Sequence, residues 1–570
     1  MYIETVPNRN SPPAILLREG WREGSKTRKR TLANLSDWPQ EKIETFRRLL
    51  RDEPLVSPHD LLATQKTLPH GHVEALLLAI RKLGLDSMIS AKRCRERDCV
   101  LAMIVERLVD PGSMLATTRP WHSTTLAEEL GVEEATEDEL YQTMDWVLER
   151  QGRIEKKLAE RHLQEGRLVL YDVSSRYYEG HSCPLAQYGH DREGKKGLPT
   201  IVYGLMTDGE GHPIAVEVYP GNTGDPSPVV DQGNKLRERF HWSRVVLVGD
   251  RGMLTQPQID KLKAHPQMGW ITALTSVGIR GLLAEGSLPL SLLNEKTLVE
   301  IHSPEYPGER LMVCYNPLLA EERKRKRAEL LAATEKALTC IGKQVERRKK
   351  KPLTATEIAL QVGKVLGHYQ MGKHFAHQIA DGKLSWSRRG ETIAREAQLD
   401  GIYVIRTSEP AEQLSAADTV RGYKSLAQVE RAFRSLKGLD LLIRHRTEEH
   451  VPAHIFLCML AYYVEWHLRR VWAPLLFEDE ELPRERQRRD PVLPATNSES
   501  AQVKKLTHQT TDGLPVQSFA TLLADLASRA RVTYSLKTDR SGPTLQQVPP
   551  PTPLQAKAYE LLNLLRVAGN

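Results

Sequence analysis

The sequence is poor in cysteine and has no long apolar run. Its six cysteines are scattered without a CxxC pair, which favours reduced thiols and argues against a zinc site. Histidines offer no metal-site spacing either, neither in the pair His374 and His377 nor in the set His445, His450 and His454. No segment approaches the roughly 18–20 continuous apolar residues of a membrane helix. The first residues also lack the basic and apolar parts of a signal peptide. A cytoplasmic protein with no membrane partner is therefore expected.

What the sequence does have is length and a large apolar fraction. At 570 residues, of which 40% are hydrophobic, it should form several domains of roughly 100–200 residues each. The formal net charge of +7 is modest for this length and does not by itself indicate nucleic-acid binding. The distribution of the charges is more informative.

One helix is predicted with unusual clarity, over residues 422–438, which read GYKSLAQVERAFRSLKG. Ser425 and Gln428 have the spacing of a capping box, so the helix should begin near Leu426. Gly438 offers a left-handed cap that would end it. An apolar stripe runs along one side, as in a helix that docks on a core.

The polar side of this helix carries Glu430 at the edge of the stripe, with Arg434 and Lys437 further along the same side. A carboxylate followed by two cations suits a metal ligand with phosphate contacts behind it. An ordinary amphipathic helix with a Glu–Arg pair is equally consistent with the pattern.

Two further acidic residues favour the metal-site interpretation. Asp172 ends the apolar run 168–172, and Asp250 ends the run 245–250. Each run reads as a buried strand that delivers a carboxylate from its carboxyl end, where open α/β sheets place their sites. Two strand-end aspartates and the helical Glu430 form an oxygen ligand set suited to Mg²⁺ or Mn²⁺.

This combination resembles the DDE transposases of bacterial insertion sequences, in the group with a tyrosine–arginine–glutamate–lysine signature. Tyr423, Glu430 and Lys437 match that signature, whereas Leu426 stands where its arginine is expected. The resemblance extends from about residue 70 to about residue 475. It implies an RNase H-like core, two Mg²⁺ ions for which Mn²⁺ may substitute, and cut-and-paste transposition through double-stranded DNA ends and a target. A homodimer in the DNA complex, nucleoid association when bound to DNA, and a hairpin intermediate at the excised end are further expectations.

Our hypothesis for the chemistry is that Asp172 bridges both metal ions while Asp250 and Glu430 each complete one. Water would first free a 3′-OH at the element end, and the same site would then direct that 3′-OH at a new phosphodiester. A metal-dependent nuclease of the same fold without strand transfer, and a catalytically idle domesticated DNA-binding protein, are the alternatives. The intact acidic set argues against the idle protein.

The expected fold class is α/β, with an RNase H-like core and a β-containing insertion domain. A mainly helical N-terminal region precedes the core, and a helical C-terminal region follows it. The predicted parts are an N-terminal hairpin and helix (1–60), a helical DNA-end-binding region (61–165), the first part of the core (166–277), the insertion (278–400), the second part of the core (401–475), and a linker with C-terminal helices (476–570).

The predicted insertion contains a long basic helix over 320–350 with cationic blocks at both ends. A cationic block at the start of a helix opposes the helix dipole, so DNA phosphate is a plausible partner for it, although a solvated arm remains open. Trp386 on a predicted hairpin would stack a flipped base or simply pack. The candidate DNA contacts are Tyr423, Arg434, Lys437, Arg251 and the block Arg323, Lys324, Arg325, Lys326 and Arg327.

Several further elements are expected along the chain. Residues 14–34 predict a hairpin that turns at 23–25 and has a basic second strand, either a charge-guarded edge or a DNA contact. Residues 137–162 predict one helix, and 298–316 predict a hairpin within the insertion. The remaining expectations are a helix that opens at 221–225 and runs to 239, and a mobile, charged linker over 478–513.

Overall fold

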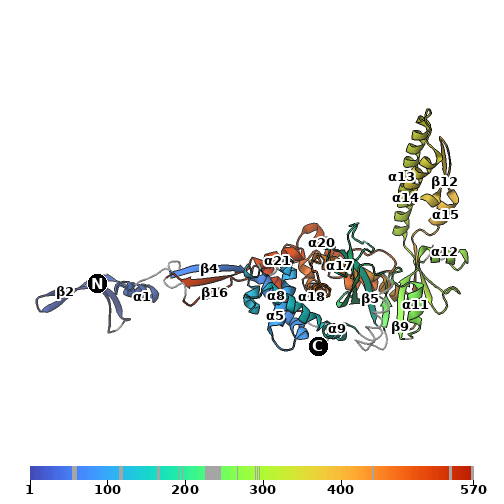
Figure 1. The fold of residues 1–570 in the computed structure, drawn as a ribbon. Coiled ribbons are helices and arrows are strands. Elements are labelled where there is room, and N and C mark those ends of the chain that lie inside the picture. The colour runs from blue at the N-terminus through green and yellow to red at the C-terminus, as the bar shows by residue number, and fades with distance from the viewer. Residues whose placement is uncertain are drawn as a thin grey trace. The chain divides into compact units, whose positions relative to one another are not determined.

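The structure is a computed structural model of the whole chain (Figure 1). It describes residues 1–9, 11–53, 61–114, 118, 120–163, 167–190, 192–195, 197–224, 245–265, 267–288, 291, 293, 296–439, 442–537 and 542–565. The chain divides into two compact units, one formed by residues 1–69 with 529–550 and the other by 70–528 with 551–570. Within the described part, no helix is long and apolar enough to cross a membrane.

The described residues of the first unit form two small antiparallel sheets and one helix. The predicted hairpin is confirmed, and Gly24 adopts the positive φ of 63° that its tight turn requires. Sequence reasoning missed the second sheet, in which a strand near residue 65 pairs with one near residue 533. The elements are β1 (Tyr2–Val6), β2 (Ala14–Glu23), β3 (Lys26–Asn34), α1 (Gln40–Leu49), β4 (Leu62–Pro69), β15 (Ala530–Leu536) and β16 (Leu545–Gln547).

The second unit is built on an eight-stranded sheet of order β10-β11-β14-β9-β8-β5-β6-β7. Strands β5, β6 and β7 form an antiparallel meander, and β5, β8 and β9 are parallel to one another. The strands are β5 (Leu168–Tyr177), β6 (Thr200–Asp208), β7 (Pro213–Pro220), β8 (Val245–Val248), β9 (Met268–Ala273), β10 (Leu298–Ile301), β11 (Arg310–Tyr315) and β14 (Ile402–Thr407).

The hairpin expected within the insertion belongs to this sheet instead. Strand β11 pairs antiparallel with β14 from Arg310 opposite Thr407 to Tyr315 opposite Ile402, and β10 covers its other edge. Strand β14 therefore has neighbours on both sides, and its backbone groups are paired where an edge strand would leave them exposed. The sequence pattern correctly predicts the hairpin, but local alternation does not show which strand it joins.

The two faces of the sheet pack against different helices. Leu170, Val246 and Val248 lie in the cluster that includes α17 (Leu426–Gly438) and α18 (His450–Val471). Their sequence neighbours Val169 and Leu247 lie in a second cluster on the opposite face, with residues of α9 (Gln151–His162) and α11 (Gln256–Lys263). This alternation is the period of two expected of strands that are buried on both faces.

The helical region before the sheet largely follows the predicted periodicity. The prediction of one helix over 137–162 is wrong, because the chain breaks at 149–150 into two helices. The Gln151 side chain donates to Glu155 Oε1 (2.8 Å) and to the Val216 carbonyl of β7 (2.8 Å), which fixes the start of the second helix against the sheet. The elements are α3 (Gly71–Lys82), α4 (Leu85–Ile89), α5 (Arg95–Val109), η1 (Pro120–His122), α7 (Leu126–Leu130) and α8 (Glu137–Leu148).

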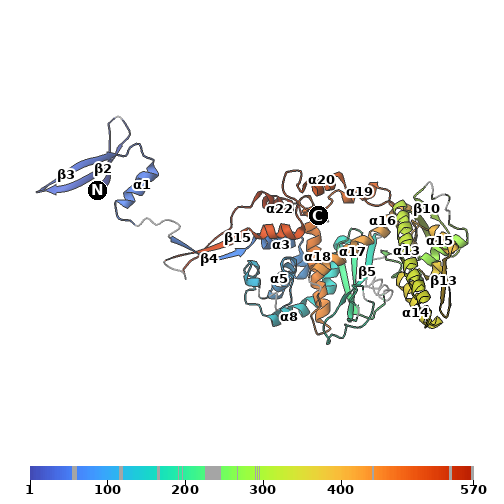
Figure 2. The ribbon, with the colours of Figure 1, turned by 90° about the horizontal axis from the view of Figure 1, so that it is seen from above.

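Between β11 and β14 the chain forms a helical hairpin beside a two-stranded sheet. Figures 1 and 2 show α13 and α14 side by side in both views, and the two helices contact each other. These elements have a core of their own, separate from the main sheet. They are α13 (Pro317–Arg347), α14 (Ala355–Tyr369), η3 (Gly372–His374), β12 (Phe375–Ala380), β13 (Lys383–Arg388) and α15 (Gly390–Ala397).

The expectation of a mobile linker over 478–513 is wrong. This segment forms two helices, and Lys504, only 4% exposed, donates to the carbonyls of Ala473 (2.9 Å) and Glu478 (2.7 Å). The charged composition suggested a mobile linker, but charged side chains of this segment such as Lys504 form hydrogen bonds within the fold. The helix expected up to residue 239 lies mostly outside the described residues. The remaining elements are α12 (Ser276–Ala284), α16 (Ala416–Lys424), η4 (Ala473–Leu475), α19 (Leu482–Arg488), α20 (Glu499–Thr507), α21 (Phe519–Ala527) and α22 (Pro553–Asn563).

Candidate active site

The two aspartates lie level with each other along neighbouring parallel strands. The expectation that a strand ends at Asp172 is wrong, because β5 continues to Tyr177, whereas Asp250 does follow the end of β8. Leu170 of β5 is opposite Val248 of β8, and Asp172 and Asp250 each follow two residues later. Adjacent strands are about 4.7–4.9 Å apart, and residues two apart point to the same face. Both carboxylates therefore belong to the face on which α17 packs.

Helix α17 carries Glu430 to that face. Its residues Val429, Phe433 and Leu436 are buried against the sheet, as the apolar stripe predicts, whereas Glu430 is exposed at the edge. Phe433 meets Tyr203 of β6 edge-on, with ring centroids 5.4 Å apart. The helix is thus fixed over β5 and β6, with its carboxylate near enough to Asp172 to affect its pKa.

The predicted caps of α17 are both wrong, although its start is correct. Ser425 has helical dihedrals because α16 runs directly into α17, and its hydroxyl donates to the Arg421 carbonyl (2.9 Å) where a cap would accept from Gln428. Gly438 is still helical, and the helix ends at Leu439 with a negative φ. A capping box requires an extended residue before the helix, which the preceding helix rules out.

The electrostatics show that the three carboxylates interact. The pKa of Asp172 is raised to about 7, first by burial and also by the negative charges of Asp250 and Glu430. The N–H of Val173 and the Arg192 guanidinium oppose this rise. A cation bound among these carboxylates would relieve their repulsion, so the residues fit the divalent metal that the family resemblance implies.

The two aspartates differ in how they are held. Asp172 is largely buried, and its Oδ1 accepts from the Val173 N–H at 2.8 Å. Asp250 is exposed, and its Oδ1 accepts from the N–H groups of Gly252 (2.9 Å) and Met253 (2.8 Å). In each carboxylate the backbone N–H groups donate to Oδ1.

Tyr423 lies beside this group, on the preceding helix α16. The pKa of its phenol is raised to about 12 by burial and by Asp250, Glu430 and Asp172, while Arg251 opposes the rise. Leu426, at the position of the signature arginine, is half-buried and packs on the main core, as the apolar stripe predicts. The chain thus has no cation at this position, and Arg251 is a cation near Tyr423.

The two cations on α17 have different surroundings. Arg434 is exposed, and the structure gives it no ion pair among the described residues. Lys437 contacts Glu193, with Nζ 2.9 Å from Oε1, and Arg176 contacts the same oxygen at 2.9 Å. Burial raises the pKa of Glu193, but hydrogen bonds from Lys437 and Arg176 outweigh this effect and hold that pKa below its usual range. Sequence reasoning missed Glu193 because nothing in its local pattern links it to a helix more than 200 residues away.

The basic block at the start of α13 divides in two. Arg327 is only 9% exposed and forms a two-pronged ion pair with Asp400, and Arg323 donates to the carbonyls of Leu399 and Ile402 (both 3.2 Å). These two arginines hold the helix to the chain that leads into β14. The other three side chains, Lys324, Arg325 and Lys326, are exposed.

Trp386 lies on β13 and is half-buried. Its ring meets Phe375 at 69°, with centroids 5.8 Å apart, within the core of the insertion. This contact favours the packing interpretation over base stacking, which stays a prediction.

A group of potential metal ligands that the sequence did not suggest lies elsewhere on the sheet. Among the described residues, His162, Asp208 and His212 are the three whose ligand atoms all lie within 4.8 Å of one another. They come from the end of α9, the end of β6 and the turn before β7. Their spacing along the chain matches no metal motif, so only the fold brings them together.

Comparisons with known proteins agree with these observations. A family model described as transposase DDE domain matches residues 164–464, slightly more than half of the chain. A second model, described as IS1634 family transposase, N-terminal domain, matches residues 3–55. The search of curated proteins finds no match. A solved structure of the piggyBac transposase synaptic complex with hairpin DNA aligns over 78% of this chain and 93% of that chain, at 12% identity and a TM-score of 0.24, too low to place any element. The two family matches identify this chain as a bacterial insertion-sequence transposase, an enzyme of the DDE transposase family.

Proposed function

We propose that this transposase binds the terminal inverted repeats of its insertion sequence, cleaves the ends by metal-dependent phosphodiester hydrolysis and joins the freed 3′-OH ends to target DNA. The carrying observation is that Asp172 within β5, Asp250 after the end of β8 and Glu430 on the helix packed over the sheet are near enough for the last two to raise the pKa of Asp172. The sheet order also supports the proposal. The meander β7-β6-β5, followed by parallel β8 and β9, has the order and directions expected of an RNase H-like core.

The three carboxylates would hold the divalent metal on which DDE transposases generally depend, with Mg²⁺ as the proposed ion. When bound, two such ions supply an activated water and neutralise the charge on the leaving oxygen. The chain's own contribution is to orient the ligands. Hydrogen bonds from Val173 to Asp172, and from Gly252 and Met253 to Asp250, hold one oxygen of each carboxylate and leave the other for an ion.

The cations beside the carboxylates would position the DNA strand. Arg434, exposed one turn after Glu430, is the proposed replacement for the missing signature arginine, because its planar fork suits a phosphate. Arg251 and Tyr423 flank the site from the strand end and from α16. Lys437 would exchange its contact with Glu193 for a phosphate.

In the insertion, the exposed side chains Lys324, Arg325 and Lys326 are the proposed phosphate contacts on DNA outside the site. A homodimer in the DNA complex is proposed as well, because an insertion sequence has two ends to cleave.

The deciding experiment incubates purified full-length protein with Mg²⁺, a labelled element end and a target plasmid. Joined product is expected from the wild type. Alanine at Asp172, Asp250 or Glu430 should abolish cleavage and joining while gel-shift binding of the end persists, since these residues are assigned as metal ligands. Asp512→Ala is the matched control, because Asp512 is exposed and lies far from the site in the sequence.

Each other outcome identifies an alternative. Cut ends without joined product would indicate a nuclease, and a shifted band without cutting would indicate a DNA-binding protein that no longer catalyses. Near-normal cleavage by Glu430→Ala would refute the assignment of the third ligand.

A further inference from the structure

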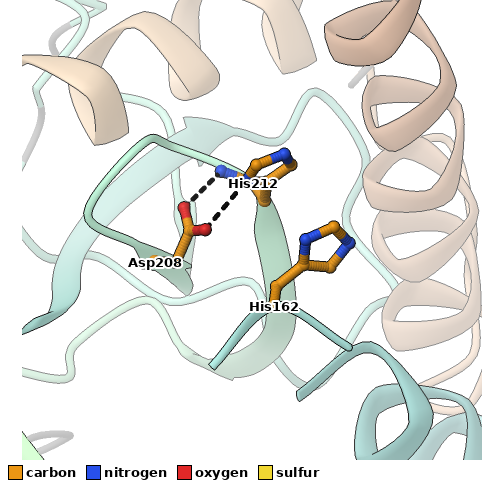
Figure 3. A group of neighbouring side chains, drawn as sticks. All are labelled: His162, Asp208 and His212. Atoms are coloured by element: carbon orange, nitrogen blue, oxygen red, sulfur yellow. Dashed lines mark hydrogen bonds and ion pairs between the residues drawn. The ribbon is translucent and has the colours of Figure 1, made fainter. Parts of the chain in front are cut away.

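The group formed by His162, Asp208 and His212 is built into the body of the main sheet. Figure 3 shows Asp208 and His212 facing each other across the β6–β7 turn, with the His162 ring beside them. The His162 and His212 rings stack with centroids 4.2 Å apart and planes at 23°. All three residues are buried or half-buried.

The turn holds Asp208 rigidly. Its Oδ1 accepts from the N–H groups of Glu210 (3.0 Å), Gly211 (2.9 Å) and His212 (2.9 Å), while its Oδ2 lies 2.7 Å from His212 Nδ1. His162 is oriented separately, because its Nε2 lies 3.0 Å from the Tyr463 hydroxyl of α18. In metal sites the residues that bind the ion are typically held in place by hydrogen bonds from neighbouring groups.

A fourth imidazole adds an independent observation. His467 of α18 is 8% exposed, and its ring centroid lies 5.2 Å from that of His212 and 5.8 Å from that of His162. Its Nε2 is buried and has no hydrogen-bond partner within the described part of the chain. Buried polar atoms in native proteins nearly always have a hydrogen-bond partner. An unpartnered Nε2 of His467 beside three potential metal ligands therefore points to a bound ion.

We propose that His162, Asp208 and His212 bind one divalent transition-metal ion of the Zn²⁺ type, with His467 as the fourth group within reach. Two or three imidazoles with one carboxylate suit zinc and related ions, whereas Mg²⁺ prefers oxygen ligands. The site is therefore chemically distinct from the carboxylates at Asp172. Its role is structural, because it joins the end of α9, the β6–β7 turn and the helix α18.

The test measures Zn²⁺ binding to the full-length protein without DNA, after removal of metal with a chelator, by calorimetry in a buffer that contains Mg²⁺. Wild type should bind one equivalent per chain, and Co²⁺ at the same site should give the visible absorption of an ordered nitrogen and oxygen ligand set. Asp208→Asn keeps an oxygen that can accept from the turn but loses the anionic ligand, and should weaken binding by about 10–100-fold. His162→Ala should weaken it at least as much.

Three controls should bind Zn²⁺ as the wild type does. His377→Ala removes an exposed histidine, Cys340→Ser removes the exposed thiol, and the double variant Asp172→Ala/Asp250→Ala removes two carboxylates of the candidate active site. At the same concentration, zinc should also raise the melting temperature of wild type more than that of Asp208→Asn. The proposal is overturned if wild type binds no stoichiometric zinc or cobalt, or if binding is unchanged in both Asp208→Asn and His162→Ala.

Discussion

Removing the charge of Asp172 should stabilise the metal-free protein at neutral and alkaline pH. The pKa of its carboxyl rises from the ordinary 3.8 to about 7 on folding, and the side chain is largely buried. Between these two values the folded state binds more protons than the unfolded state. Stability therefore falls as the pH rises through this window, and the whole penalty is present above about pH 7.

The magnitude follows from the same two values. At about 1.36 kcal/mol for each tenfold change in proton affinity, the interval from 3.8 to about 7 corresponds to an upper value of about 4 kcal/mol. Asp172→Asn keeps the shape of the side chain and has no proton to lose, so the variant should escape the penalty. Below about pH 4 the two proteins should be nearly equal in stability, because the aspartate is then protonated in both states.

The assay is urea unfolding followed by circular dichroism, in chelator, at pH values from 4 to 9. The difference in urea midpoint between Asp172→Asn and wild type should grow from pH 4 to pH 7 and then level off. Saturating Mg²⁺ should reduce it, because a bound cation replaces the proton. Asp512→Asn, at an exposed aspartate, should follow the wild type throughout. A difference that is independent of pH, or a wild type more stable than Asp172→Asn at pH 8, would refute the reasoning.

Three further predictions concern the cations. Glutamine at Lys324, Arg325 and Lys326 together should leave thermal stability unchanged and lower the slope of log K against log salt by about 0.9 for each phosphate that is no longer neutralised. In contrast, Arg327→Ala should destabilise the chain by about 3–5 kcal/mol, because it leaves Asp400 without its buried partner. Equal effects of the two variants on DNA binding and on stability would contradict this division of the basic block. Arg434→Ala should reduce end cleavage well beyond any change in melting temperature, with partial rescue by Arg434→Lys, and cleavage at the wild-type rate over a range of DNA concentrations would exclude Arg434 from the site. Glu193→Gln should release Lys437 and Arg176 and steepen the salt dependence of DNA binding; an unchanged slope in filter-binding titrations would mean that neither cation reaches a phosphate.

The carboxylates of the candidate active site could be picked out from the sequence because each belongs to a strong local pattern. Asp172 and Asp250 follow uninterrupted apolar runs, and Glu430 lies on a clear amphipathic stripe. Parallel pairing then fixes the two aspartates level with each other, a consequence of sheet geometry that needs no further information.

The features that were missed depend on tertiary context. Ser425 fails as a cap only because another helix precedes it, and the charged segment after residue 478 docks only because Lys504 finds carbonyl groups elsewhere in the fold. The packing of α9 on the sheet brings His162 and Asp208 together, and their spacing along the chain does not predict this proximity.

The pairing of β4 with β15 has a consequence for synthesis. Residues 62–69 leave the ribosome early, but their partner strand, residues 530–536, is among the last parts of the chain to be made. At about 5–20 residues per second, the segment that forms β4 waits about 23 to 92 seconds without its partner strand. Each nascent chain thus carries an open strand edge until its translation is almost complete, and polysomes that bring several such chains together offer these edges to one another. Premature termination before residue 530 would leave β4 without this partner.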